Sequence, residues 1–187
     1  MSRGAGGRMG WMAAGVALAL ALVATTRAHA VPKVGAQRPD VKLVDAWDRY
    51  LEMRGLGAKP VLVVYEDKDS ANDNQALKDE LAKLAKGDRY KKAIALVAVA
   101  DVSAYDFWPV KGFVKDAIQK ESKKFGTTIY CDWDGSARRA LDVVVGESSV
   151  VLYGRDGKVV FARSGALSAD ERRALIELLR RQVEGGA

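Results

Sequence analysis

Residues 146–168 read GESSVVLYGRDGKVVFARSGALS and contain the clearest structural pattern in this sequence. Two apolar runs, 149–153 and 158–163, flank the turn-forming tetrapeptide Gly-Arg-Asp-Gly, which predicts a β-hairpin. Ser168 and Glu171 then have the spacing of a helical capping box, and apolar residues follow them at helical intervals. This stretch therefore predicts a closing unit of two strands and a helix.

Strand and helix signals alternate upstream of that unit. Residues 61–65 form a continuous apolar, β-branched run, which is typical of a strand buried on both faces. The expected order is a strand at 41–44, a helix from Asp45 to Gly55, a strand at 61–65, a helix at 70–86, a buried strand at 94–100, a helix at 111–125, a strand at 127–131 and a short helix to Leu141. In the helix at 111–125, the side chains expected to face inward are Phe113, Val114, Ala117 and Ile118. With its closing hairpin and helix, this order predicts an α/β thioredoxin-like fold, a central mixed sheet flanked by helices.

The N-terminus indicates export. Arg3 and Arg8 precede an uncharged apolar stretch at 9–26, and Ala28-His29-Ala30 is a small-x-small cleavage pattern. We expect a signal peptide at 1–30 that is cleaved after Ala30, a polar lead-in at 31–40, a folded domain at 41–187 and a periplasmic location. The alternative is an uncut membrane anchor, for which an apolar stretch of 18 residues is at the short end. After cleavage, no membrane span is expected.

Cleavage would change the chemistry open to the chain. It removes three of the 30 Lys and Arg residues and none of the 24 Asp and Glu residues, which leaves an excess of three positive charges. That excess gives no case for nucleic-acid binding. His29, the only histidine, is also lost, and Cys131 is the only cysteine. A serine or cysteine triad with histidine, a histidine-ligated metal and an internal disulfide are thus excluded, and we expect no cofactor.

Residues 146–168 also carry a resemblance to a known family. The run Glu-Ser-Ser, apolar strand, Asp-Gly turn, strand and Gly-Ala-Leu-Ser resembles the YtfJ-like family of small bacterial periplasmic proteins of the thioredoxin superfamily. Asp88-Arg89-Tyr90, Lys123-Lys124 and Asp134-Gly135 agree less sharply, and the resemblance extends over most of 33–183. It implies an exported thioredoxin-like fold without an established biochemical role.

A more distant likeness to redoxins implies that two marks of dithiol chemistry are missing. In redoxins, a strand like 61–65 leads to a helix N-terminus that carries the reactive cysteine and lowers its pKa. Ser70 and Asp73 stand approximately at these cysteine positions, and serine cannot cycle through a disulfide. By spacing, Ser148 takes the place of the cis-proline that faces the active loop. The likeness therefore implies that the fold is kept without its dithiol chemistry.

An acidic loop follows the strand at 61–65. Glu66, Asp67, Asp69 and Asp73 cluster there with Ser70, which suggests a calcium loop. However, counting from Asp67 puts alanine at the fifth position, asparagine at the sixth and lysine at the twelfth, so the EF-hand pattern fails. The simpler interpretation is a solvated loop whose acids favour the positive end of the next helix. We predict no metal site.

Glu147, Ser148 and Ser149 are the second polar group of interest. In a thioredoxin-like fold they lie beside the acidic loop, on the face that usually binds peptides. The alternative is ordinary turn and capping chemistry. We therefore name Asp67, Asp69, Ser70, Asp73, Glu147, Ser148 and Ser149 as candidate binding residues for a peptide or a periplasmic protein, and Trp108 and Trp133 as aromatics that either border this face or belong to the core.

Cys131 supports a competing hypothesis. As the only redox-capable group, it suggests a redoxin-like thiol oxidoreductase, a peroxidase or a redox accessory. A reactive thiol needs a nearby cation and some exposure, yet its neighbours are Tyr130 and Asp132 at the end of a strand. These surroundings favour a packed small hydrophobe. The preferred hypothesis is a non-catalytic binding protein.

Overall fold

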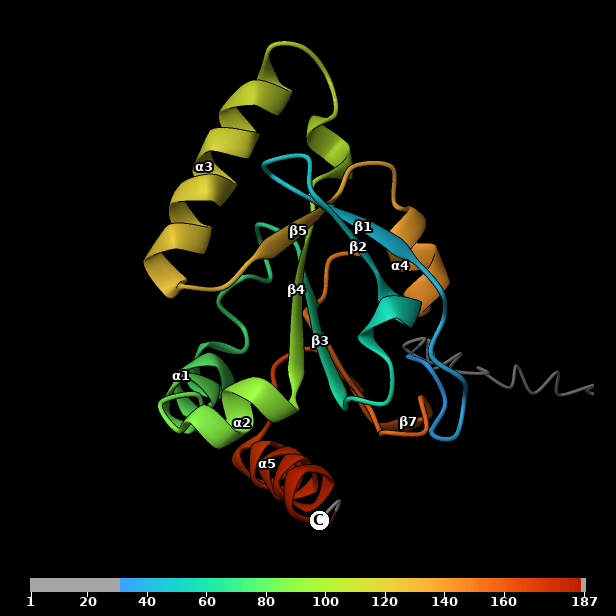
Figure 1. Ribbon diagram of the computed structural model, residues 1–187. Coiled ribbons are helices and arrows are strands. Elements are labelled where there is room, and N and C mark those ends of the chain that lie inside the picture. Colours follow the sequence, from blue (N-terminus) through green and yellow to red (C-terminus); the bar gives the residue numbers. More distant parts are fainter. Residues whose placement is uncertain (1–30, 186–187) are drawn as a thin grey trace, which may run out of the picture.

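A seven-stranded mixed sheet forms the centre of the molecule (Figure 1). The computed structural model describes residues 31–185, so the expected signal peptide lies outside the described residues. The strands are β1 (Lys42–Asp45), β2 (Tyr50–Glu52), β3 (Val61–Glu66), β4 (Ala95–Asp101), β5 (Ile129–Asp132), β6 (Ser149–Tyr153) and β7 (Val159–Ser164). The helices are α1 (Gln75–Leu84), α2 (Asp88–Ala93), α3 (Val110–Phe125), α4 (Ser136–Leu141) and α5 (Ala169–Glu184), with 3₁₀ turns η1 (Met53–Leu56) and η2 (Ser103–Tyr105).

The strand order across the sheet is β2-β1-β5-β4-β3-β6-β7. Strands β3, β4 and β5 are parallel, whereas β6 pairs antiparallel with β3 and β7 pairs antiparallel with β6. The predicted hairpin, the capping box at Ser168 and the α/β class are confirmed. None of the helices in residues 31–185 combines the length and the apolar character needed to cross a membrane.

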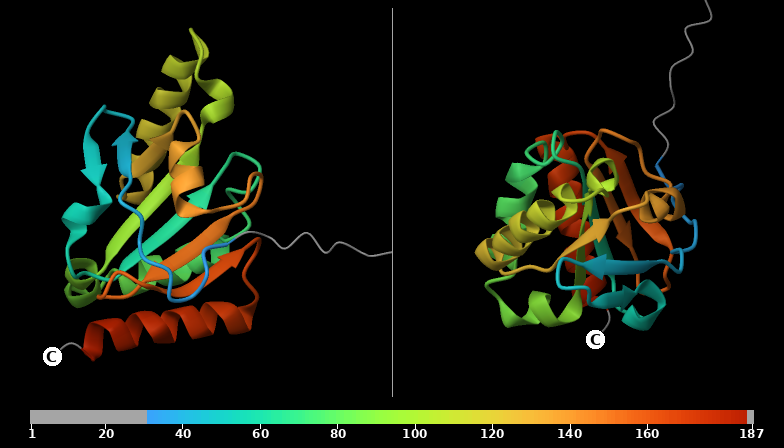
Figure 2. Two further views of the ribbon diagram at one scale, coloured as in Figure 1. Left: turned by 90° about the vertical axis from the view of Figure 1, so that its right-hand side faces the viewer. Right: turned by 90° about the horizontal axis from the view of Figure 1, so that it is seen from above.

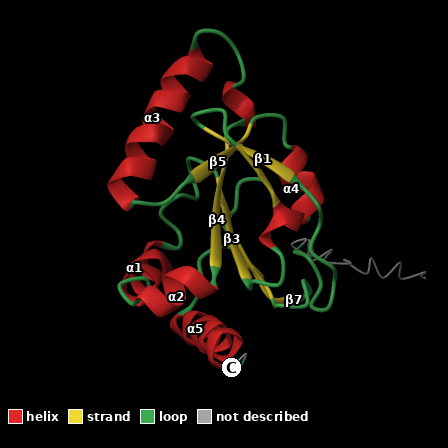
Figure 3. Ribbon diagram, viewed as in Figure 1, coloured by secondary structure: helices red, strands yellow, loops and turns green. Residues whose placement is uncertain are grey.

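Helices cover both faces of this sheet (Figures 2 and 3). Alternate side chains of β3 point to opposite faces, as the two-residue period of a strand requires. Val61, Val63 and Tyr65 pack with residues of η1 and α4, while Leu62 and Val64 pack with residues of α1 and α5. A third, smaller cluster joins α3 to the end of β5.

The predicted helix from Asp45 to Gly55 is wrong. The chain instead turns at 46–49 and returns as β2, antiparallel to β1. The Asp45 carboxylate accepts hydrogen bonds from the backbone N–H groups of Trp47 (2.8 Å) and Arg49 (3.0 Å), and Asp48 adopts a φ of 64°. An aspartate that bonds backbone groups two and four residues ahead closes a turn as readily as it caps a helix.

The faces of two other elements also differ from the prediction. Helix α3 ends at Gly126 as expected, but Phe113 is 70% exposed and Ala117 is also exposed, because only Val114 and Ile118 reach the sheet. Strand β4 was expected to be buried on both faces, yet Leu96 is 41% exposed. One face of this central strand is therefore left partly uncovered between α1 and α3.

Four chain segments meet at one edge of the sheet. Because β3, β4 and β5 are parallel, their carboxyl ends lie side by side, with Glu66 opposite Ala100 and Asp101 opposite Asp132. The antiparallel β6 begins at the same edge, where Ser149 pairs with Tyr65. The acidic loop and the segment 146–149 are thereby brought together, as the topology predicted.

Candidate functional site

The turn before α1 is closed by a serine and an aspartate. The buried Ser70 hydroxyl donates to the Asp67 carboxylate at 2.7 Å, and the Asp67 N–H donates back to the Ser70 oxygen at 3.0 Å. Burial alone would raise the pKa of Asp67, but the hydrogen bonds from Ser70 outweigh it and lower that pKa. Ser70, which the likeness to redoxins placed approximately at a redox cysteine, is thus engaged in a structural turn.

Asn74, which sequence reasoning missed, forms the centre of a buried polar network. Its Nδ2 donates to the Ser148 hydroxyl oxygen at 2.8 Å and to the Gly165 carbonyl at 3.0 Å. Its Oδ1 accepts from the Leu167 N–H at 2.9 Å. This side chain therefore ties the start of α1 to β6 and to the loop between β7 and α5.

The network continues from Ser148 to a partly buried ion pair. The Ser148 hydroxyl donates to Glu66 Oε1 at 3.1 Å, and Lys78 Nζ lies 2.6 Å from Glu66 Oε2. Lys78 also donates to the Ala71 carbonyl at 2.5 Å. Burial raises the pKa of Glu66 above its usual range, in spite of the opposing effect of Lys78. Ser148, expected by spacing to take the place of the cis-proline, is thus hydrogen-bonded to both Asn74 and Glu66.

The other predicted binding residues divide into exposed and buried groups. Asp69 and Asp73 are exposed to solvent, and Glu147 is half-buried and accepts from the Ser164 hydroxyl at 2.5 Å. Ser149 is completely buried, and within residues 31–185 its hydroxyl has no hydrogen-bond partner. The structure thus brings the two predicted segments together, with carboxylates at the surface and the serines beneath them.

Cys131 lies inside the sheet, in β5, between Val44 of β1 and Ala100 of β4. Its side chain is buried and packs with residues that connect the sheet to α3. Burial, reinforced by the negative charge of Asp45, raises the pKa of this thiol to about 12. A thiol with that pKa is almost completely protonated near neutral pH, which is the opposite of what a reactive cysteine requires.

A second buried acid stands at the end of β5. The Asp132 carboxylate accepts from the Tyr65 hydroxyl at 2.9 Å and from the backbone N–H groups of Ala137 and Arg138 at the start of α4. Burial, followed by the charge of Asp132, raises the pKa of Tyr65. Because all these contacts anchor α4 on the sheet, we assign Asp132 a structural role.

Trp108 and Trp133, predicted either to border the binding face or to belong to the core, differ in their exposure to solvent. Trp108 is 91% exposed, whereas Trp133 is partly buried and carries the Lys111 ammonium over its ring, 4.6 Å from the centroid.

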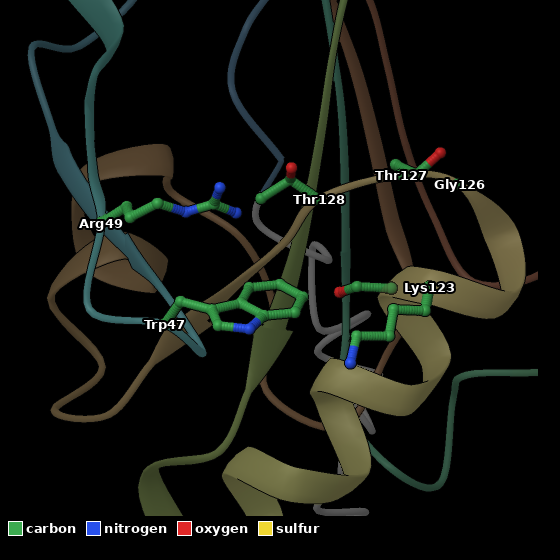
Figure 4. Close-up of a pocket in the computed structure, with 7 residues that line it drawn as sticks. Trp47, Arg49, Lys123, Gly126, Thr127 and Thr128 are labelled. Carbon is green, nitrogen blue, oxygen red and sulfur yellow. The ribbon is translucent and has the colours of Figure 1, made fainter.

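A small pocket of about 140 Å³ lies elsewhere, between the β1–β2 turn and the end of α3 (Figure 4). It is lined by Trp47, Arg49 and Lys123 among others, and none of the predicted site residues belongs to it. Within the described part of the chain, no three His, Cys, Asp or Glu side chains are grouped as metal ligands would be.

The sheet order and the closing hairpin and helix define a thioredoxin-like fold. The chain belongs to the YtfJ_HI0045 family, described as bacterial protein of unknown function, whose model matches residues 63–182. No curated protein matches the sequence.

Solved structures with the same fold include several redox proteins. A candidate DsbE thiol:disulfide interchange protein from Chlorobium tepidum is similar with a TM-score of 0.60 and 19% identity, over 81% of this chain and 98% of that one. The bacterioferritin comigratory protein of Xanthomonas campestris, studied for alkyl peroxide reduction, is similar with a TM-score of 0.57 and 21% identity, over 83% and 99% of the two chains. At these identities the likeness establishes the fold alone.

Proposed function

We propose that this chain is an exported, periplasmic binding protein that uses a thioredoxin-like scaffold without dithiol chemistry. The observation that supports this proposal is that two serines, expected from the likeness to redoxins at the redox positions, are both held in hydrogen bonds. The hydroxyl of Ser70 is bonded to Asp67, and the hydroxyl of Ser148 is bonded to Asn74 and Glu66. Serine hydroxyls in these places can stabilise the loop structure through hydrogen bonds, but they cannot carry out thiol–disulfide exchange.

The surface above this network defines the partner we propose. Asp69 and Asp73 are exposed, and Asp67 and Glu147 are half-buried. The ammonium group of Lys78 is already paired with Glu66. This acidic edge favours an extended peptide or protein segment that carries lysine or arginine, because complementary charge steers association and sets specificity.

The competing hypothesis requires Cys131 to react, and its environment opposes this. The thiol is buried, its pKa is raised to about 12 and the strongest nearby charge, Asp45, is negative. A peroxidase or thiol oxidoreductase needs a thiolate that meets its substrate. We therefore give Cys131 a packing role.

A binding experiment with matched variants tests the proposal. A fluorescently labelled lysine-rich peptide is titrated against the protein at low and at physiological salt. We expect saturable binding that falls at least fivefold in Asp69→Asn/Asp73→Asn and stays unchanged in Asp116→Asn/Glu177→Gln, which removes equal charge from exposed positions on α3 and α5. Equal weakening of peptide binding in both double variants would mean that binding depends only on the net charge of the protein, and would refute the acidic edge as the binding site.

Enzyme assays separate the two function classes. We expect the wild type and Cys131→Ser to be equally inactive in disulfide reduction and in peroxide reduction. Turnover by the wild type that Cys131→Ser abolishes would replace the binding proposal with the thiol-enzyme hypothesis.

A further inference from the structure

A wide groove lies on one face of the sheet, in the gap that α1 and α3 leave between them. It has a volume of about 960 Å³ and lies between α1 and α3, over β4. Its floor includes Leu96, Ala98 and Ala100 of β4 together with Ile129 of β5, and Phe125 of α3 stands at its side. The size is within the range of about 300–1,000 Å³ that is usual for small-molecule sites.

The floor of this groove is apolar where a parallel sheet is normally covered. Central parallel strands are usually buried on both faces, yet Leu96 is 41% exposed and Phe125 is 54% exposed. Ala98 and Ala100 carry only methyl groups, so the sheet surface is deep at these two positions. The resulting trough is bounded by larger side chains of the two helices, which suits a narrow apolar chain lying along β4.

The two ends of the groove carry opposite charge. Lys86 and Lys91 belong to the segment between α1 and β4, at the end where β4 begins. Among the described side chains, neither lysine has an ion pair or a hydrogen bond, whereas Lys78 and Lys124 are paired with glutamates. Glu66 and Asp67 line the other end. An anionic group therefore finds free cations at one end and carboxylates at the other.

We propose that this groove binds a single-chain amphiphile with an anionic head, whose alkyl chain lies over Ala98 and Leu96 and whose head meets Lys86 and Lys91. Burial of the alkyl chain, which removes apolar surface from water, supplies the free energy of binding. The lysines orient the chain and discriminate against neutral or cationic heads. A carboxylate and a phosphate head satisfy the same lysines, so long-chain fatty acids and lysophospholipids are the two sources of this chemistry.

Titration of the purified protein with cis-parinaric acid, a fluorescent fatty acid, tests this site. Displacement is then measured with palmitate, hexadecyl phosphate and neutral hexadecanol, all below their aggregation limits. We expect saturable one-to-one binding, with displacement by both anions at least tenfold stronger than by the alcohol. The stronger anion identifies the head group. Absence of saturable binding, or equal displacement by the alcohol, would refute the proposal.

Matched variants locate the ligand. Lys86→Glu/Lys91→Glu should weaken binding of the anions at least tenfold and leave hexadecanol unchanged, whereas Lys59→Glu/Lys158→Glu, with the same change of net charge at exposed positions, should have no effect. Ala98→Phe should abolish binding of all three ligands, and Ala140→Phe, exposed on α4, should not. If Ala98→Phe fails to fold, Leu96→Asp serves in its place, because that side chain is already partly exposed.

A second copy of the chain is the other occupant that the experiment distinguishes. The molar mass of the wild type and of Leu96→Asp is measured by light scattering over a range of concentrations. We expect both to be monomers. A wild-type dimer that Leu96→Asp dissociates would show that the groove is covered by another copy, and would overturn the amphiphile assignment.

Discussion

Replacing Asn74 with alanine tests whether the buried polar network holds the candidate site together. The substitution removes three hydrogen bonds, to Ser148, Gly165 and Leu167, that link α1 to the segments 148–149 and 165–167. At about 1 kcal/mol for each net hydrogen bond, the free energy of unfolding should fall by about 3 kcal/mol. The loss should not fall below this central value, because the Leu167 N–H, next to a buried side chain, is left without its partner.

The measurement is urea denaturation followed by circular dichroism, with linear extrapolation to zero denaturant. Asn72→Ala is the matched control, because Asn72 is exposed two residues away and its side chain has no hydrogen bond among the described residues. That control should change the free energy of unfolding by less than about 0.5 kcal/mol. A loss below about 1 kcal/mol for Asn74→Ala, or a loss equal to that of the control, would refute the structural role of the network.

Three further predictions concern other parts of the fold. Because the pKa of Cys131 is raised to about 12, its thiolate fraction at pH 8 is about one in 10⁴, so maleimide labelling should be at least about 1,000-fold slower in the folded protein than in urea; comparable rates would contradict this. Asp45→Asn should lower the free energy of unfolding at pH 7, and by less at pH 3. Burial opposes ionisation of Asp45, but hydrogen bonds from Arg49 and Trp47 lower its pKa overall. The stabilisation by this carboxylate is therefore complete above the unfolded pKa of about 4 and is lost as the pH falls through the folded pKa. If urea denaturation gives the same loss of unfolding free energy at both pH values, the ionised Asp45 carboxylate is not the source of the stabilisation. Gly126→Ala should lower the free energy of unfolding by about 1 kcal/mol, since φ is +62° at this helix end and the cost is one of backbone conformation; unchanged stability would contradict it.

The elements that sequence reasoning predicted correctly are those in which a local pattern determines the outcome. The run at 61–65 is apolar on every residue and lies in the middle of the sheet. Ser168 and Glu171 form the capping box because both partners lie within one helical turn. Asp45 shows the limit of this reasoning, since the same carboxylate caps a helix or closes a turn, and pairing with Tyr130, 85 residues away in sequence, decides between them.

The centre of the candidate site could not be predicted from local pattern. Asn74 meets Ser148 across a sequence separation of 74 residues and Leu167 across 93. An asparagine near the start of an expected helix gives no indication that its amide will turn inward toward a distant strand. The exposure of Leu96 was equally hidden, because it depends on how far apart α1 and α3 lie on the sheet and not on the sequence of β4.

The acidic edge and the groove are adjacent, and this decides which substitutions can distinguish them. Glu66, Asp67 and Lys78 line one end of the groove and also belong to the edge, so replacing any of them disturbs both surfaces. Asp69 and Asp73 lie on the edge alone, whereas Lys86 and Lys91 border the groove alone. Loss of peptide binding in the aspartate variants with amphiphile binding intact, and the reverse in the lysine variants, therefore requires two separate sites. If both variants lose both ligands, one continuous surface must replace the two proposed here.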